Sequence, residues 1–341
     1  MIIILTEGEK HVSSTYLKKK SVFALLAVLL SFALVLAGCG SAGGNQQAAA
    51  PDKSEPSAGK TEEYTVKHAM GETPIKGTPK KVVVLTNEGT EAVLALGIKP
   101  VGAVKSWNGD PWYDHIKKDM EGVKVLGTEH QPNLEEIAAL KPDLILGVKL
   151  RHEKIYQQLS AIAPTVLSET LRGEWKNNFK LYAEALNKKA EGEQVISAFD
   201  KRVEEFKKKA GDKLKTKVSL VRFMPDRIRI YYVDSFAGII LKQIGFARPE
   251  KQNIDKGFAD NVTKERIPEM EGDILFYWTW ETGDGKASQA EKEWTNDPLW
   301  KNLNVVKNGK AYKVDDSIWN TAGGVKAANL LLDDLEKFFL K

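Results

Sequence analysis

An internal repeat constrains the fold of this chain more than any other feature of its sequence. NLEEIAALKPDLILGV (residues 133–148) aligns without a gap with TKERIPEMEGDILFYW (residues 263–278). The alignment pairs two acids with identical acids, Glu135 with Glu265 and Asp143 with Asp273. Each copy predicts a short helix, a turn and a buried strand. Because a solenoid needs at least about three units, two copies predict two similar α/β lobes. The alternative is a chance similarity between two ordinary αβ units.

The segments around the repeat have the same alternating character. KVVVL (81–85) is a short β-branched run of the kind that is buried in a parallel sheet. Residues 88–96 predict a helix that ends at Gly97, and residues 99–104 predict the next strand. A looser copy of this unit begins at KVSLV and carries an additional strand-like stretch, RIRIYYV (227–233). This order indicates α/β architecture with Rossmann-like lobes.

A single long helix is predicted between the lobes. Val195, Phe199, Val203 and Phe206 recur at helical spacing, and Gly211 is a suitable end. We therefore expect an N-terminal lobe at 63–190, an interlobe helix at 191–212 and a C-terminal lobe at 213–341. A helix of about 20 residues spans ~30 Å. Since a helix does not bend sharply without a defect, we expect only a small closing motion of the ligand cleft between the lobes.

The N-terminal segment has the features of an export signal. Lys18, Lys19 and Lys20 precede an apolar run at 22–37, whose sixteen residues reach about 24 Å, less than the ~30 Å of a bilayer core. LAGC ends at Cys39, the only cysteine, and resembles a bacterial lipobox. We expect residues 1–38 to be a lipoprotein signal peptide, Cys39 to carry the lipid, and the small, polar residues 39–62 to form a flexible tether. A transmembrane anchor is the alternative.

The charge balance argues against nucleic acid as a partner. The formal charge is +4, and removal of residues 1–38, with four lysines and two glutamates, lowers it to +2. Because positive and negative side chains are so nearly equal in number, the sequence predicts neither a nucleic-acid surface nor a polybasic membrane patch. An intrachain disulfide is impossible with one cysteine, so the folded part depends on its apolar core.

From the lipobox to the C-terminus, the chain resembles the substrate-binding lipoproteins of bacterial ABC importers that carry ferric siderophores, haem or vitamin B12. The resemblance rests on four segments besides the lipobox: TPKKVVVLTNEGTEAVLALGIKPVGA, NLEEIAALKPDLIL, the interlobe helix and DPLWKNLNVVKNGKAYKVDD. VRFMPDRIRIYYVDSFAG (221–238) is similar to the iron-siderophore branch, especially its Gram-positive hydroxamate members.

The resemblance implies a monomeric receptor, lipid-anchored on the outer face of the cytoplasmic membrane of a Gram-positive bacterium. It implies ferric siderophore as the ligand, with iron held only by the siderophore and no directly bound cofactor or metal. It also implies an ABC permease dimer as the partner, whose arginines would meet one acid on each lobe. The positions that match are Glu135 and Glu265. A purely structural role is the alternative, with each acid in the first turn of a helix capped by Asn133 or Thr263.

The ligand site is predicted at the carboxyl ends of the strands, where open α/β sheets bind ligands. Large aromatic side chains and basic groups follow these strand ends, and core or rim packing is the alternative for each tryptophan. The candidate ligand-binding residues are Lys105, Trp107, Lys149, Arg151, Trp175, Arg222, Tyr231, Trp278, Trp280 and Trp319. Arg222 is the leading candidate, because a guanidinium can grip a carboxylate or metal-bound oxygen with two hydrogen bonds.

The aromatic content favours a hydroxamate or citrate–hydroxamate siderophore, while Lys105 and Lys149 keep a catecholate possible. Haem and cobalamin are the nearest alternatives, since both suit an aromatic cleft. Direct metal binding is disfavoured because all five histidines lie at or before His152, so the second lobe has none. No GxSxG, HExxH, P-loop or strand-linked GxGxxG motif is present, so an extracellular enzyme is the less favoured class.

Overall fold

The computed structural model describes residues 62–340. The predicted signal peptide (1–38), the predicted lipid attachment site Cys39 and residues 40–61 of the predicted tether lie outside the described residues. Within the described part of the chain, no helix combines the length and the apolar character needed to cross a bilayer.

The N-terminal lobe is built on a sheet of five parallel strands in the order β5-β4-β3-β6-β7. The strands are β3 (Val82–Val84), β4 (Gly102–Ala103), β5 (Lys124–Val125), β6 (Leu144–Val148) and β7 (Thr165–Ser168). The helices of this lobe are α1 (Asn87–Ala95), α2 (Leu134–Leu140), α3 (Lys149–His152), η1 (Glu153–Ile155), α4 (Tyr156–Ile162), η2 (Arg172–Glu174) and α5 (Trp175–Ala185). All residues of β3, β6 and β7 are buried, which explains why these strands are nearly continuous apolar runs. An antiparallel hairpin, β1 (Glu63–His68) with β2 (Gly71–Lys76), precedes the sheet.

The C-terminal lobe contains a second five-stranded sheet in the order β10-β9-β8-β11-β12. Its strands are β8 (Val218–Phe223), β9 (Ile228–Tyr231), β10 (Phe258–Ala259), β11 (Ile274–Thr279) and β12 (Ala311–Lys313). β8, β11 and β12 are parallel, whereas β9 and β10 run antiparallel to their neighbours, so the additional stretch RIRIYYV supplies an antiparallel strand. The helices are η3 (Gly211–Lys215), α7 (Phe236–Ile244), η4 (Glu250–Gln252), η5 (Lys264–Met270), α8 (Lys286–Thr295), α9 (Pro298–Asn302), α10 (Asn304–Lys307), the π-helical turn η6 (Ser317–Thr321) and α11 (Val325–Phe339).

The repeated aspartates make the same contacts in the two lobes. Oδ2 of Asp143 accepts a hydrogen bond from the backbone N–H of Lys81 at 2.9 Å, and Oδ2 of Asp273 accepts one from Lys217 at 2.8 Å. Each aspartate precedes a repeat strand, and each lysine precedes the parallel strand beside it. The acid therefore aligns the starts of two neighbouring strands, which gives these repeated residues a structural role.

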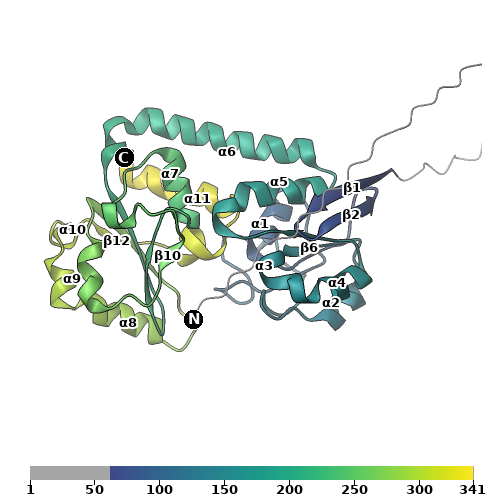
Figure 1. The fold of residues 1–341 in the computed structure, drawn as a ribbon, viewed down its shortest axis with the longest axis horizontal. Helices are drawn as coiled ribbons and strands as arrows, with labels where there is room; N and C mark the ends of the chain where they lie inside the picture. The colour runs from purple at the N-terminus through teal and green to yellow at the C-terminus, as the bar shows by residue number, and fades with distance from the viewer. Residues whose placement is uncertain (1–61, 341) are drawn as a thin grey trace, which may run out of the picture. The chain divides into compact units, whose positions relative to one another are not determined.

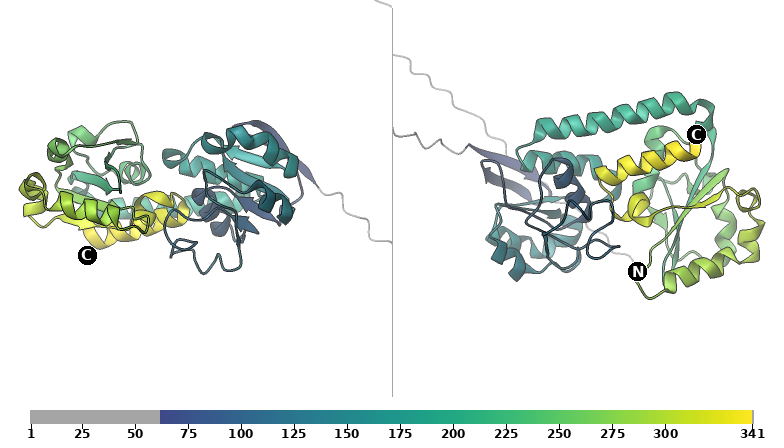
Figure 2. Two further views of the ribbon diagram at one scale, coloured as in Figure 1. Left: turned by 90° about the horizontal axis from the view of Figure 1, so that it is seen from below. Right: turned by 180° about the vertical axis from the view of Figure 1, so that it is seen from behind.

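One long helix, α6 (Lys189–Ala210), links the two sheets and confirms the predicted interlobe helix (Figure 1). It contacts α5 of the N-terminal lobe and α7 and α11 of the C-terminal lobe. The buried face consists of residues at helical spacing, Ile196, Phe199, Val203 and Phe206. The helix ends at Gly211, whose φ of 52° lies in the left-handed region that glycine adopts readily. Figure 2 shows α11, in yellow, beside α6.

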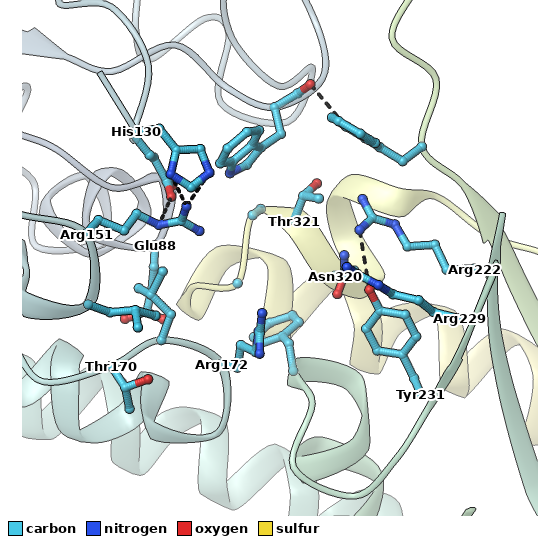
Figure 3. A pocket seen from close by; sticks show the side chains of 18 of the residues that line it. Glu88, His130, Arg151, Thr170, Arg172, Arg222, Arg229, Tyr231, Asn320 and Thr321 are labelled. Atoms are coloured by element: carbon cyan, nitrogen blue, oxygen red, sulfur yellow. Dashed lines mark hydrogen bonds and ion pairs between the residues drawn. The ribbon is translucent and has the colours of Figure 1, made fainter. Parts of the chain in front are cut away.

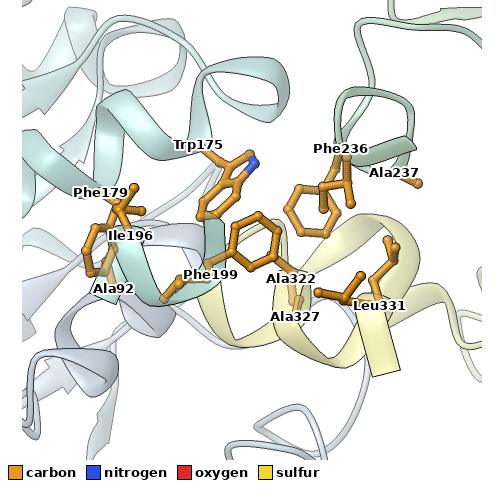
Figure 4. Close-up of a cluster of buried hydrophobic side chains, with 14 of the residues drawn as sticks. Ala92, Trp175, Phe179, Ile196, Phe199, Phe236, Ala237, Ala322, Ala327 and Leu331 are labelled. Atoms are coloured by element: carbon orange, nitrogen blue, oxygen red, sulfur yellow. The ribbon is translucent and has the colours of Figure 1, made fainter. Parts of the chain in front are cut away.

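A hydrophobic cluster joins the lobes beneath this helix (Figure 4). The ring of Trp175 at the start of α5 lies 5.3 Å from Phe199 of α6 and 6.4 Å from Phe236 of α7. Ala322 and Leu331 pack in the same cluster from the C-terminal part of the chain. Because one continuous core connects both lobes, the junction resists separation more strongly than a flexible linker would. The fold prediction of two similar α/β lobes is confirmed.

Candidate ligand-binding site

A pocket of about 360 Å³ lies where residues of both lobes meet (Figure 3). Its lining residues are Glu88, Trp107, Glu129, His130, Leu150, Arg151, Thr170, Leu171, Arg172, Arg222, Met224, Arg229, Tyr231, Phe236, Trp280, Asn320, Thr321, Ala322 and Gly323. Glu88 follows β3, Arg151 follows β6 and Trp280 follows β11. The carboxyl ends of the parallel strands therefore supply the site, as expected for open α/β sheets.

Arg222 enters the pocket from β8 already paired with a carboxylate. Its Nε donates to Oδ1 of Asp316 at 2.7 Å, and its Nη1 donates to the hydroxyl of Tyr231 at 3.3 Å. Both partners of the ion pair are buried, with 6% and 3% of their side chains exposed. Burial alone would lower the pKa of Arg222, but Tyr231 and Asp316 outweigh it and raise this pKa above its usual value. The guanidinium is therefore a fixed cation of the pocket wall.

Asp316 also connects the lobes. Its Oδ2 accepts hydrogen bonds from Nδ2 of Asn108 in the N-terminal lobe at 2.9 Å and from Oγ1 of Thr321 at 3.0 Å. Since both carboxylate oxygens are engaged, the orientation of Arg222 is coupled to a loop of the opposite lobe.

The N-terminal lobe presents a matching arrangement around Arg151. Its Nε lies 3.0 Å from Oε2 of Glu129. Oε1 of Glu129 accepts hydrogen bonds from the backbone and side-chain nitrogens of Asn87 at 2.7 and 2.8 Å. Nη1 of Arg151 lies 2.8 Å from Nε2 of His130. Arg151 is thus ion-paired with a buried carboxylate, whereas Arg222 is both ion-paired and hydrogen-bonded to its carboxylate.

Two tryptophans meet between these arginines. The ring centroids of Trp107 and Trp280 lie 6.4 Å apart in an edge-to-face arrangement, and Nε1 of Trp280 donates to the backbone oxygen of Trp107 at 3.4 Å. Each ring also has a cation over it from its own lobe. The Arg151 guanidinium lies 5.4 Å from the Trp107 ring, and that of Arg222 lies 5.5 Å from the Trp280 ring. The aromatic contact therefore bridges the two lobes within the pocket lining.

Arg172 and Arg229 complete a group of four arginines in the lining. Both guanidiniums lie over the ring of Phe258, at 5.0 and 4.0 Å. Nε of Arg229 donates to Oδ1 of Asp260 at 2.9 Å, whereas Arg172 forms no ion pair with any residue of 62–340. Burial is the largest cause that lowers the pKa of Arg172, and the cations Arg229 and Arg151 lower it further. A negatively charged ligand group would offset this repulsion.

Five of the ten predicted ligand residues line the pocket: Trp107, Arg151, Arg222, Tyr231 and Trp280. Lys105 is exposed and does not line it. Lys149 pairs with Glu169 at 2.9 Å and lies in a neighbouring hollow with Lys154. This hollow shares Arg151 and Arg172 with the main pocket, so Lys149 contributes to a basic rim instead of the pocket wall.

The placement of Trp175, Trp278 and Trp319 in the ligand site is corrected by the structure. All three are buried in the hydrophobic core and are absent from the pocket lining. Trp278 packs 5.2 Å from the Tyr231 ring and 6.3 Å from Trp319. Nε1 of Trp319 donates to Asp334 at 3.1 Å. Their burial stabilises the apolar core, and Trp278 supports Tyr231 of the pocket wall directly.

Several pocket residues were missed by the sequence analysis, above all Glu88, Glu129, Arg172 and Arg229. Arg229 could have been found, because it lies two residues before Tyr231 and pairs across the strands with Arg222. Arg172 has no such pattern. It is the first residue of the short helix η2 after β7 and has a φ of 76°, an unusual value for a residue other than glycine.

The two predicted docking acids lie on equivalent elements. Glu135 is in the first turn of α2, where Oδ1 of Asn133 caps the helix by accepting from Glu136 N–H at 3.1 Å. Glu265 is in the first turn of η5, and a hydrogen bond from Thr263 is the largest cause that lowers its pKa. Both side chains are exposed and make no ion pair with residues 62–340. Glu135 and Glu265 can therefore each stabilise the start of a helix and still present an exposed carboxylate to a partner.

His152 is buried and has a structural role. Its Nδ1 accepts from the Val148 N–H at 3.1 Å, and its Nε2 lies 3.0 Å from the backbone oxygen of Glu129. Burial lowers its pKa to about 4, so the ring is neutral. Among residues 62–340, no group of three or more His, Cys, Asp or Glu side chains is arranged to hold a metal ion.

Comparison with known proteins gives a consistent result. Residues 82–318 match the family described as "Periplasmic binding protein". The chain is 54% identical over 330 residues to the "Probable siderophore-binding lipoprotein YfiY" of Bacillus subtilis, covering 94% of this chain and 99% of that protein. It is 31% identical over 264 residues to the "Achromobactin-binding periplasmic protein" of Dickeya dadantii, covering 76% and 86%. The solved structure of Staphylococcus aureus SirA complexed with staphyloferrin B is similar with a TM-score of 0.75 and 42% identity, covering 80% of this chain and 97% of that one.

Proposed function

This chain belongs to the periplasmic binding protein family, and from that premise we propose that it captures a mildly anionic ferric siderophore and delivers it to the permease of an ABC importer. The iron is held by the siderophore's own oxygens, without a protein–metal bond. The names of its relatives, a siderophore-binding lipoprotein and an achromobactin-binding protein, support this class of ligand.

The observation that carries the proposal is the group of four arginines in an aromatic pocket. Aromatic faces bury the large flat surface of a siderophore, and guanidinium groups bind carboxylate or metal-bound oxygens with directed, charge-assisted hydrogen bonds. The main pocket holds no lysine, so its fixed cations are all of the forked, planar kind that suits carboxylates.

The ion pairs of these arginines limit the charge of the ligand. A carboxylate already accompanies Arg151, Arg222 and Arg229, and only Arg172 makes no ion pair with residues 62–340. A triscatecholate complex carries a high negative charge, which one uncompensated cation does not balance. A neutral hydroxamate complex leaves Arg172 unpaired. A citrate–hydroxamate complex, with a small negative charge, fits best.

Delivery is proposed to use Glu135 and Glu265. These acids are exposed on equivalent elements of the two lobes, so they present similar charges to a permease built as a dimer. Attachment is proposed through a lipid on Cys39, which would hold a monomeric receptor on the outer face of the cytoplasmic membrane. Nothing in this sequence of capture and delivery requires a catalytic step.

The test is a tryptophan-fluorescence titration of the purified protein, because Trp107 and Trp280 line the pocket. The ligands are a ferric citrate–hydroxamate, a neutral ferric trihydroxamate, a ferric triscatecholate, haem and cobalamin. We expect saturable quenching by the citrate–hydroxamate complex at the lowest concentration. Stronger binding of haem or cobalamin would overturn the siderophore assignment, and the absence of any saturable response would overturn the proposed function.

A further inference from the structure

Glu88 is a buried acid in the wall of an arginine-lined pocket (Figure 3). It is the second residue of α1, directly beyond β3, and only 5% of it is exposed. The start of the helix is fixed by Thr86, whose Oγ1 accepts from the Gly89 N–H at 3.0 Å. Glu88 is therefore held at the pocket by the strand-to-helix turn between β3 and α1.

The two carboxyl oxygens of Glu88 have different surroundings. Oε1 accepts a hydrogen bond from Nδ2 of Asn178 at 2.6 Å, and the same Nδ2 donates to the backbone oxygen of Thr170 at 2.7 Å. Oε2 is buried and has no hydrogen-bond partner among residues 62–340. Since buried polar atoms are nearly always hydrogen-bonded, an unpartnered oxygen in a ligand pocket indicates a group that completes its bonding with the ligand.

The charges around Glu88 favour its neutral form. Two further carboxylates are close, Glu91 on the same helix and Glu129 on the loop before α2, and both raise its pKa. The hydrogen bond from Asn178 on α5 lowers this pKa, and so does the nearby backbone of Arg172 in η2. The α1 N-terminus also favours the anion. Burial is nevertheless the largest cause, and together these effects raise the pKa of Glu88 to about 8.

The protonation state of Glu88 decides whether Oε2 can donate a hydrogen bond or can only accept one. A neutral carboxylic acid carries one O–H donor, whereas a carboxylate only accepts hydrogen bonds. The arginines attract ligand oxygens that carry negative charge. A neutral Glu88 adds a donor to this set, and an ionised Glu88 would repel the same oxygens.

We propose that protonated Glu88 donates a hydrogen bond from Oε2 to an oxygen of the bound ferric siderophore, so that ionisation of Glu88 weakens binding. This inference rests on the proposed function. It makes Glu88 a ligand-binding residue that selects for complexes with an acceptor oxygen on the α1 side of the pocket. It also makes the affinity of the receptor dependent on the external pH.

The test compares wild-type protein with Glu88→Gln, using the ferric citrate–hydroxamate complex between pH 6 and pH 9.5. Glutamine has nearly the same shape, donates a hydrogen bond at every pH and does not titrate. We expect the wild-type Kd to increase by about tenfold or more between pH 6 and pH 9.5. A difference of about one unit between the pKa of Glu88 in the bound and the free protein corresponds to a tenfold change in affinity. We expect the Kd of Glu88→Gln to change much less. Glu135→Gln removes an exposed acid and is the matched control, with the wild-type pH dependence.

Changes in the siderophore complex itself affect all three proteins equally, so the difference between them reports on Glu88. Parallel curves for wild type and Glu88→Gln would overturn the inference while leaving the proposed function intact. The proposed function fails separately if the wild type binds no siderophore at any pH.

Calorimetry of the wild type covers the case in which Glu88→Gln does not fold. Siderophore binding is measured in buffers with different ionisation enthalpies, which reports the number of protons taken up. If the ligand requires neutral Glu88, binding takes up protons at pH 8.5, where free Glu88 is partly ionised, and does not at pH 6. Equal proton exchange at both pH values would overturn the inference.

Discussion

Oε2 of Glu91 in the N-terminal lobe accepts a hydrogen bond from the backbone N–H of Ala327 in the C-terminal lobe, at 2.9 Å. Ala327 lies in the first turn of α11, whose N-cap residue Gly324 has no side chain to bond that turn. An acid from one lobe therefore caps a helix of the other. Oε1 of Glu91 pairs with His115, so both carboxylate oxygens are occupied.

Glu91→Ala is expected to lower the free energy of unfolding by about 1–3 kcal/mol, because it removes a helix cap and leaves a buried N–H unpaired. Urea denaturation measures this loss, with Glu193→Ala on the exposed face of α6 as the control. Since the same bond joins the lobes, Glu91→Ala is also expected to widen the distribution of interlobe distances in small-angle scattering. Unchanged stability would contradict the capping role.

Arg172→Gln is expected to weaken binding of the citrate–hydroxamate complex by about 1.5–3 kcal/mol, or roughly ten- to 150-fold, the usual strength of a hydrogen bond to a charged group. Arg172 makes no ion pair with residues 62–340, so the change leaves no partner charge unpaired. We therefore expect little change in the unfolding midpoint. An unchanged Kd would remove Arg172 from the ligand site.

Arg222→Ala makes a poor test of ligand contact, although Arg222 is the residue that the sequence favours most. It would leave Asp316 buried without its cation, a change that typically destabilises a protein by about 3–5 kcal/mol. A loss of binding in this variant would therefore report on folding and on the coupling through Asn108 as well as on the ligand.

The fold could be predicted because its strands are buried on both faces and appear as continuous apolar runs. The rule that open α/β sheets bind ligands at the carboxyl ends of their strands located the pocket, but it does not tell which way a side chain points. Trp278 lies within β11 and is buried, whereas Trp280, beyond the strand end, turns into the pocket. The position of Arg172 depends on a positive φ at that residue, which the sequence does not announce, and Glu88 looks like an ordinary first-turn acid until its burial is known.

The double variant Glu135→Ala, Glu265→Ala is expected to abolish siderophore uptake by cells and to leave the Kd of the purified protein unchanged. Both acids are exposed and neither lines the pocket, so their removal is expected to affect docking and not the ligand site. The control is Glu193→Ala, Glu205→Ala, which removes the same charge from α6. If the control blocks uptake equally, net charge and not these two positions governs docking.

The contribution of Glu88 to the stability of the unliganded protein is expected to decrease as the pH rises from about 4.5 to about 8, the ordinary and the raised pKa of Glu88. In this range the unfolded chain has released the proton that the folded protein retains, so each increase in pH favours unfolding. The contribution of neutral Glu88 is fully present below about 4.5 and is lost as the pH passes about 8. Its size is on the order of a few kcal/mol.

Urea denaturation at pH 5, 6, 7 and 8 tests this for wild type, Glu88→Gln and the surface control Glu135→Gln. Glu88→Gln has no proton to lose, so its stability relative to wild type is expected to increase steadily from pH 5 to pH 8. Glu135→Gln is expected to follow the wild type at each pH. A constant difference between wild type and Glu88→Gln would mean that Glu88 is already ionised in the folded protein at pH 5, and that its burial does not disfavour the charge.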